Sequence, residues 1–270
     1  MTTVLDSIIE GVREDLSGRM AKVSLAELER QIKDVAPAQD AAGKLRDAKF
    51  SVIAEVKRSS PSKGHLAEIS APQDLARQYQ AGGAAVVSVL TEERRFNGSL
   101  ADLDIVREHL EIPILRKDFM VSDYQVFEAR AHGADVILLI VAGLAQTQMR
   151  DLNQIAQGLG MSVLVEVHDE AELDRAMDLA PKLVGVNARN LKTLDVDLAV
   201  CHRMIKQIPS EVVAVAESGI SNLSEVQELA RSGADAILVG EALVKGGKPE
   251  QTVRQWTEAG TEQRIESDLR

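Results

Sequence analysis

Short aliphatic runs recur along the chain, and each is followed by a stretch whose apolar residues have helical spacing. The eight runs are Val52–Val56, Ala85–Val89, Ile112–Leu115, Val136–Ile140, Val163–Val167, Leu183–Val186, Val212–Ala216 and Ala236–Val239. Most are almost continuously apolar, as expected for parallel strands that are covered on both faces. Eight such strands alternating with helices predict an α/β fold, a single (β/α)8 TIM barrel. An open doubly wound sheet is the alternative, but it usually has fewer strands, and no Gly-x-Gly-x-x-Gly turn follows the first run.

Residues 1–48 precede the first strand and lie outside the eightfold pattern. Leu5 and Ile8 belong to an apolar stripe with helical spacing, and a second short amphipathic stretch follows it. We therefore expect an N-terminal helical extension over residues 1–48 packed on the barrel, a catalytic barrel domain over residues 49–260 and a polar C-terminal tail over residues 261–270. The extension is expected to cover one mouth of the barrel, and the pattern does not say which.

Composition narrows the class of protein. The chain has 270 residues, 45% of them hydrophobic, with a net charge of -11, and no broad basic stripe is present, so we expect no nucleic-acid partner. No run approaches the roughly 18 apolar residues of a spanning helix, so we expect no membrane association. The single cysteine, Cys201, lies in an apolar helical pattern and is expected in the core of a cytoplasmic protein.

Ionisable and amide side chains fall at the carboxyl ends of the predicted strands, where TIM barrels build their active sites. They are Glu55 and Lys57 after the first strand, Lys117 after the third, Glu166 in the fifth, Asn187 and Arg189 after the sixth, and Glu217 after the seventh. Taken singly, each is as easily a solvated loop residue, but a charge inside a buried strand costs several kcal/mol unless it is paired. The set therefore predicts an acid–base site.

The charges of this set balance, because three basic residues (Lys57, Lys117 and Arg189) face three glutamates. At about 4 Å and an effective dielectric near 20, each opposite pair attracts by roughly 4 kcal/mol before desolvation. No cluster of Cys or His has the spacing of zinc ligands, and the interleaved lysines disfavour magnesium at the carboxylates, so we expect no metal. His168 follows the fifth strand, and a structural role is the favoured interpretation for it.

Small residues follow the last two strands. Ser218 and Gly219 come after the seventh strand, and Gly240 and Glu241 after the eighth. In TIM barrels these two loops, with the N-terminus of a short helix, commonly bind phosphate. We therefore expect a small phosphorylated molecule as the substrate.

Six motifs at the strand ends make the chain resemble the indole-3-glycerol phosphate synthase family over nearly its whole length. The motifs are Glu55-Val-Lys-Arg-Ser-Ser-Pro-Ser, Thr91-Glu-Glu-Arg-Arg-Phe-Asn-Gly, Lys117-Asp-Phe, Leu164-Val-Glu-Val, Gly185-Val-Asn-Ala-Arg-Asn-Leu and Ala216-Glu-Ser-Gly-Ile. The resemblance implies a carboxy-lyase of tryptophan biosynthesis. Such an enzyme converts 1-(2-carboxyphenylamino)-1-deoxyribulose 5-phosphate into indole-3-glycerol phosphate, carbon dioxide and water without a cofactor.

The resemblance also implies roles for individual residues. Lys117 would be the general acid and Glu166 the general base. The other implied catalytic residues are Glu55, Lys57, Asn187 and Glu217. The implied substrate-binding residues are Arg189, Phe96, Phe119 and Leu191, and the implied phosphate-binding residues are Ser60, Ser218, Gly219, Gly240 and Glu241. The family often has a small residue where this chain has Glu241, so its carboxylate is expected to point away from the phosphate.

The resemblance further implies that the extension covers the catalytic mouth and that residues 61–64 form a mobile lid. Two other functions remain open at this point: an isomerase or aldolase barrel in which a lysine forms a Schiff base, and a catalytically inactive barrel that binds a metabolite. A monomer or a weak homo-oligomer is expected.

Overall fold

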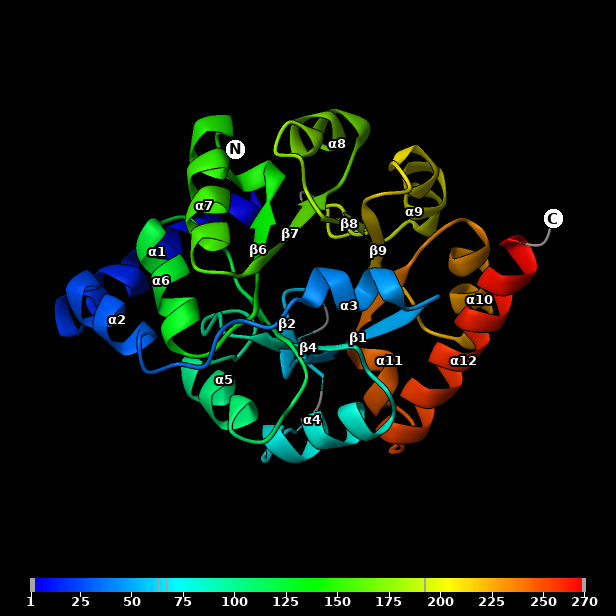
Figure 1. The fold of residues 1–270 in the computed structure, drawn as a ribbon, viewed down its shortest axis with the longest axis horizontal. Coiled ribbons are helices and arrows are strands. Elements are labelled where there is room, and N and C mark those ends of the chain that lie inside the picture. Colours follow the sequence, from blue (N-terminus) through cyan, green and yellow to red (C-terminus); the bar gives the residue numbers. More distant parts are fainter. Residues whose placement is uncertain (1–2, 63, 67, 192, 269–270) are drawn as a thin grey trace.

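The computed structural model describes residues 3–62, 64–66, 68–191 and 193–268. Eight parallel strands close into a barrel in the order β1-β10-β9-β8-β7-β6-β5-β4 (Figure 1). Their bounds are β1 Ser51–Val56, β4 Val86–Leu90, β5 Ile114–Lys117, β6 Val136–Ile140, β7 Ser162–Val167, β8 Leu183–Asn187, β9 Val213–Glu217 and β10 Ala236–Val239. All eight predicted strands are present, and the predicted (β/α)8 barrel is confirmed.

Helices surround the barrel and return the chain to the start of each next strand (Figure 1). They are α4 Pro72–Ala81, α5 Leu100–Arg107, α6 Asp123–Ala131, α7 Gln146–Gly158, α8 Glu170–Met177, α9 Leu198–Met204, α10 Leu223–Arg231 and α12 Pro249–Asp268. A short helix, α11 (Glu241–Val244), follows β10, and a small antiparallel hairpin of β2 (Ser59–Ser60) and β3 (Gly64–His65) follows β1. Because α12 runs to Asp268, residues 261–268 of the predicted polar tail continue this last helix.

The helix ends follow the chemistry of their sequences. Asp169 and Asn222 are N-caps whose side chains accept hydrogen bonds from the backbone N–H groups of Glu172 and Glu225. Gly133 adopts φ 80° after α6 and Gly233 φ 107° after α10, conformations that are strained for residues with a Cβ. The N-caps mark where α8 and α10 begin, and the glycines end α6 and α10 and direct the chain into the next strand.

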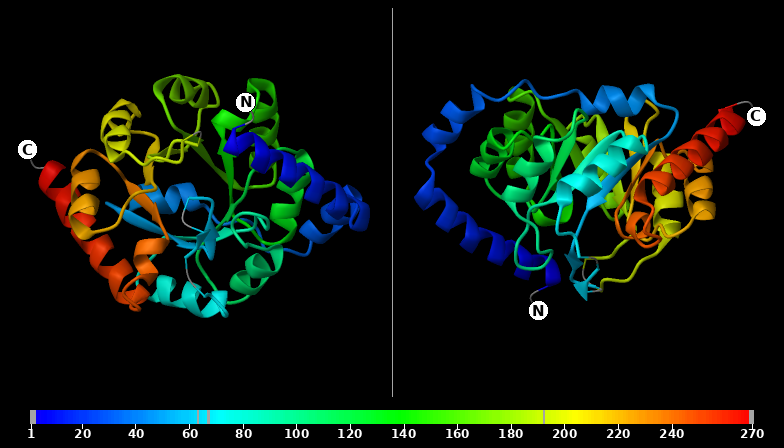
Figure 2. Two further views of the ribbon diagram at one scale, coloured as in Figure 1. Left: turned by 180° about the vertical axis from the view of Figure 1, so that it is seen from behind. Right: turned by 90° about the horizontal axis from the view of Figure 1, so that it is seen from below.

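The N-terminal extension forms three helices, α1 (Val4–Lys22), α2 (Leu25–Ile32) and α3 (Ala41–Asp47), which wrap around one side of the barrel. Figure 2 (right) shows α1 (dark blue) on the side of the β2–β3 hairpin and α3 on the opposite side. Helix α3 buries Leu45 completely against the residues that fill the barrel. The backbone N–H of Ala42 donates to Ser162 Oγ at the start of β7, 3.4 Å away. The extension therefore reaches both ends of the barrel, whereas the sequence predicted only one.

The core has two layers, as the alternation of side chains along a strand requires. Inward residues such as Ile53 and Leu138 fill the barrel, and outward residues such as Val52 and Leu139 pack against the helices. Cys201 lies in the outer layer, fully buried, as predicted. Within the described part of the chain, no helix is long and apolar enough to cross a membrane.

Candidate active site

A cavity of about 440 Å³ opens at the carboxyl ends of the strands, a volume typical of small-molecule sites. The residues that the sequence assigned to catalysis or to binding of the substrate or its phosphate all line it: Glu55, Lys57, Ser60, Phe96, Lys117, Phe119, Glu166, Asn187, Arg189, Leu191, Glu217, Ser218, Gly219, Gly240 and Glu241. The fold thus brings together side chains from segments that are far apart in the sequence. Polar groups line the inner part of the cavity, and aromatic and small residues line its sides.

A buried ion pair joins two strands across the cavity floor. Lys117, at the end of β5, places Nζ 3.1 Å from Glu166 Oε2 on β7. Asn187, at the end of β8, donates from Nδ2 to Glu166 Oε1 at 3.0 Å. Both oxygens of the Glu166 carboxylate therefore have fixed partners, and the side chain is only 1% exposed.

Glu217 approaches the same lysine from β9, with Oε2 3.7 Å from Lys117 Nζ. Its other oxygen is buried and has no hydrogen-bond partner among the described residues. Gly185 makes room for this carboxylate, because a Cβ at that position would lie 2.0 Å from Glu217 Oε1. The glycine of the Gly-Val-Asn motif is therefore required by the position of Glu217.

Glu55 and Lys57 lie on the same side of β1 and form an ion pair, with Nζ and Oε1 2.5 Å apart. Gly240 packs against this pair. A Cβ on Gly240 would lie 2.9 Å from the carbonyl oxygen of Glu55 and 3.3 Å from its Oε1. The first and last strands of the barrel thus meet at this point without a side chain between them.

The ion pair sets the charge states at the centre of the site. Burial alone would lower the pKa of the Lys117 ammonium, but the charges of Glu166, Glu217 and Glu55 outweigh it and raise that pKa. Burial likewise opposes ionisation of Glu166, yet the charge of Lys117, together with His168 and Asn187, outweighs it and holds the pKa of Glu166 well below its usual range. Lys117 is therefore charged and Glu166 ionised in the free protein.

The pKa of Glu217 is shifted in the opposite direction to that of Glu166. Burial first, and then repulsion from Glu166, raise its pKa to about 8, and attraction to Lys117 opposes this only in part. Close to neutral pH, Glu217 is therefore largely protonated, while Glu166 a short distance away is ionised. Two carboxyl groups with separated pKa values are typical of acid–base sites.

Two aromatic rings form one side wall of the cavity. The rings of Phe96 and Phe119 have centroids 6.0 Å apart and planes tilted by 39°. Phe96 is held by Glu92, a buried carboxylate that accepts hydrogen bonds from the backbone N–H groups of residues 94, 95 and 96. The two rings therefore offer an apolar surface for a flat ring. Leu191, in the loop after β8, lines the cavity as well.

The opposite side of the cavity is formed by loops of small residues. Ser218 and Gly219 have φ angles of 67° and 78°, so the chain turns sharply after β9 and exposes backbone N–H groups. A Cβ on Gly219 would lie 2.4 Å from Val196 Cγ1, which explains the glycine. Ser60, in the hairpin after β1, lines the cavity as well. The predicted lid, residues 61–64, includes residue 63, which lies outside the described residues.

Arg189 does not join the glutamate cluster in the way the charge count suggested. Its Nη1 donates to the carbonyl oxygen of Leu194 at 2.9 Å. Burial lowers its pKa, and the charge that opposes this effect is that of Glu241. A different cation contacts the cluster, because Nε2 of His168 lies 3.3 Å from Glu166 Oε1.

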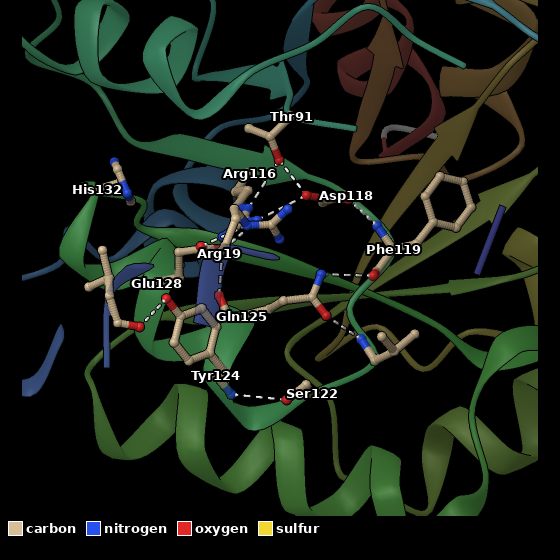
Figure 3. Close-up of polar contacts among 12 residues, drawn as sticks. Arg19, Thr91, Arg116, Asp118, Phe119, Ser122, Tyr124, Gln125, Glu128 and His132 are labelled. Carbon is tan, nitrogen blue, oxygen red and sulfur yellow. Dashed lines mark hydrogen bonds and ion pairs between the residues drawn. The ribbon is translucent and has the colours of Figure 1, made fainter. Parts of the chain in front are cut away.

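Sequence reasoning missed the polar network behind Lys117 (Figure 3). Arg116 points outward from the barrel, is 1% exposed and donates from Nη2 to Asp118 Oδ2 and from Nε to Thr91 Oγ1, both at 3.0 Å. Its Nη2 also lies 3.0 Å from Glu128 Oε2, and Glu128 pairs with Arg19 of α1 at 2.9 Å. The network ties the extension to the strand that carries Lys117. The one sequence signal for this network is the alternation of side chains along β5, which places Arg116 on the outer face when Lys117 faces inward.

Helix α1 also supplies part of the cavity wall, which the sequence did not assign by residue. Val4, Leu5 and Ile8 lie among the lining residues. Lys245, just after α11, lines the cavity as well and adds a positive charge near Glu241. Among the described residues, no group of three or more His, Cys, Asp or Glu side chains is placed to hold a metal ion.

Comparisons with known proteins identify the family of the chain. The family model of indole-3-glycerol phosphate synthase matches residues 5–256. Indole-3-glycerol phosphate synthase 1 of Streptomyces coelicolor is 55% identical over 258 residues, covering 96% of each chain. The indole-3-glycerol phosphate synthase of Arthrobacter sp. strain FB24 is 52% identical over 265 residues, covering 96% of this chain and 97% of the relative.

Solved structures support the fold alone. The 3-hexulose-6-phosphate synthase of Salmonella typhimurium superposes with a TM-score of 0.65 at 12% identity, over 79% of this chain and 100% of that one. Thiamine phosphate pyrophosphorylase of Pyrococcus furiosus gives 0.62 at 16% identity, over 81% and 98%. The family match and the identities above 50% over nearly the whole length decide the family, and the chain belongs to the indole-3-glycerol phosphate synthase family.

Proposed function

We propose that the protein catalyses closure of the indole ring in tryptophan biosynthesis, converting 1-(2-carboxyphenylamino)-1-deoxyribulose 5-phosphate into indole-3-glycerol phosphate, carbon dioxide and water. The observation that carries this proposal is the buried Lys117–Glu166 pair on the floor of the cavity, with one protonated amine and one ionised carboxylate. The reaction needs a proton donor and a proton acceptor close together, and each typically contributes about 10²–10⁴-fold.

The order of events follows from the chemistry of the substrate. The aromatic carbon that carries the carboxylate attacks the ribulose carbonyl, and Lys117 donates a proton to the carbonyl oxygen as the new bond forms. Loss of carbon dioxide then restores the aromatic ring. Finally the new hydroxyl group leaves with a proton as water, and Glu166 removes a proton from the five-membered ring. Lys57, paired with Glu55, supports the substrate carboxylate or the second protonation.

The two sides of the cavity suit the two ends of this substrate. The apolar wall of Phe96, Phe119 and Leu191 suits the phenyl ring, with Arg189 near its carboxylate. The loops at the opposite side suit the phosphate, which Ser60, Ser218, Gly219, Gly240 and the backbone N–H of Glu241 would bind. Asn187 and Glu217 would orient Glu166, Lys117 and the hydroxyl groups of the substrate.

The experiment is to add the carboxyphenylamino-deoxyribulose phosphate to the purified protein and to follow the fluorescence of the indole product. We expect turnover without added metal or cofactor, and no adduct after treatment with borohydride, because no step forms a Schiff base. A folded protein without turnover would refute the proposal. An adduct trapped on a lysine would favour an isomerase or aldolase instead.

We further propose that residues 1–48 act as an extension separate from the catalytic barrel. Its α1 residues would close the substrate cavity, since Val4, Leu5 and Ile8 line it. We also propose that the protein works in the cytoplasm as a monomer or a weak homo-oligomer, which sedimentation at several concentrations would test.

A further inference from the structure

His168 lies directly behind Glu166. It follows β7 two positions after Glu166, so both side chains leave the chain on the same side. Its Nε2 is 3.3 Å from Glu166 Oε1, and its Nδ1 is 2.9 Å from Glu172 Oε2. The side chain is 11% exposed, and His168 is not among the residues that line the cavity. His168 therefore contacts the proposed base, Glu166, from outside the cavity.

We infer that His168 is a positioning residue for Glu166, held in place by Glu172 and needed for full activity. This inference rests on the proposed function, in which Glu166 removes a proton from the substrate. It assigns a function to a residue for which the sequence favoured a structural role.

Glu172 fixes the orientation of the histidine. One carboxylate oxygen, Oε2, accepts from the backbone N–H of His168 at 2.8 Å and faces its ring Nδ1 at 2.9 Å. Glu172 is itself fixed at the start of α8, where its backbone N–H donates to Asp169 Oδ1 at 2.9 Å. With Nδ1 tied to Glu172, the opposite nitrogen of the ring is directed at Glu166. The residues that cap α8 are therefore connected to Glu166 through the ring of His168.

The contact between His168 and Glu166 is a close approach of a ring nitrogen to a carboxylate oxygen. Nε2 is buried and has no well-aligned hydrogen-bond acceptor among the described residues, although Glu166 Oε1 is 3.3 Å away. A ring with a carboxylate at each nitrogen favours the imidazolium form. Burial lowers the pKa of His168, but Glu166 and Glu172 outweigh it and raise that pKa to about 10.

The positive charge of His168 stabilises ionised Glu166 when Lys117 has lost its proton. Lys117 neutralises Glu166 in the free protein, but it gives up its proton when it acts as an acid. Glu166 would then lie as an anion beside Glu217 in a buried site, where an unpaired charge is costly. His168 keeps a positive charge next to Glu166 at this step. The other charged groups around the histidine are Glu172 and, at the same helix start, Asp169.

The first test is kinetic and uses His168→Gln, whose amide fills a similar space without a charge. We expect kcat to fall about 10–100-fold, as when a residue that supports a catalytic group is removed, while KM stays nearly unchanged because the substrate does not touch this residue. The matched control is His132→Gln. His132 pairs with Asp104 at 2.6 Å and does not line the cavity, so its replacement should leave kcat unchanged.

The second test does not depend on turnover. NMR titration of the His168 ring in the wild-type protein should show an imidazolium up to pH 8 and above. In Glu172→Gln the His168 signal should titrate about 1–3 pH units lower, because one of its two carboxylates is gone. A wild-type ring that is neutral at pH 7.5 would overturn the inference whether or not the protein is active, and so would an active protein whose His168→Gln variant keeps full kcat. No turnover by the wild type counts against the proposed function, and the titration then decides the inference on its own.

Discussion

Replacement of Lys117 by methionine tests the electrostatic account of the site. The change keeps most of the side-chain length but removes the charge that lies 3.1 Å from Glu166 and 3.7 Å from Glu217. Turnover should fall by at least about 10²–10⁴-fold because the proton donor is lost. Binding of the substrate should stay within about tenfold, since the aromatic wall and the phosphate loops are intact. Product fluorescence measures turnover, and calorimetry with the variant measures binding.

The same variant should lose stability in a way that depends on pH. Removing one partner of a buried ion pair costs about 3–5 kcal/mol, because the other charge is left uncompensated. Lys117 depresses the pKa of Glu166, so its stabilising effect is present above the unfolded pKa of about 4.5 and fades as pH falls below it. Denaturation at pH 7 and pH 4 should give a larger loss at pH 7. Unchanged turnover, or an equal loss at both pH values, would refute the reasoning.

Three further changes probe other parts of the structure. Gly185→Ala should displace the carboxylate of Glu217 and destabilise the protein by about 1–3 kcal/mol with loss of kcat, whereas Gly18→Ala, which has open space in α1, should be neutral or slightly stabilising in the same assays. Arg116→Met should lower the free energy of unfolding by about 3–5 kcal/mol in urea, because Glu128 loses a buried partner. The pKa of Glu217, raised to about 8, stabilises the folded protein fully below pH 4.5, and this stabilisation is lost as pH rises through 8. The free energy of unfolding of the wild type, relative to that of Glu217→Gln, should therefore fall between pH 4.5 and pH 8. A difference that stays flat between pH 5 and pH 8 would contradict the account of Glu217.

The barrel was predictable because its signals are local. Each strand is a short apolar run, so that runs such as Val136–Ile140 and Ala236–Val239 match β6 and β10 at both ends. Most of the following helices also begin with a side-chain N-cap, such as Ser122 before α6 and Asn222 before α10. The site was predictable for a related reason. In a closed parallel barrel all carboxyl strand ends meet at one mouth, so Lys117 and Glu166 had to approach each other once both were assigned to strand ends.

The role of His168 was not predictable from the sequence. Glu172 stands three residues after Asp169, and this spacing is already explained by a helix cap. That Glu172 also holds the ring of His168 depends on the angle between β7 and α8, which no local pattern specifies. Of the two roles of Glu172, the sequence pattern therefore indicates only the helix cap.

Long-range polar contacts were missed for the same reason. Arg116 alternates with Lys117 along β5, so the sequence could place it on the outer face, but not its partners. Glu128 lies on the next helix, and Arg19 lies in the extension, 109 residues from Glu128. The path of the extension from the mouth to the opposite end of the barrel likewise depends on packing, since Leu28 of α2 is buried beside Tyr124 of α6.

The central claim is that the Lys117–Glu166 pair closes an indole ring with loss of the substrate carboxylate. The most direct measurement is the ratio of carbon dioxide released to indole-3-glycerol phosphate formed when the wild-type protein turns over 1-(2-carboxyphenylamino)-1-deoxyribulose 5-phosphate. We expect equal amounts of both products, and neither product from Lys117→Met at the wild-type rate. Consumption of the substrate without carbon dioxide, or carbon dioxide without the indole product, would contradict the claim.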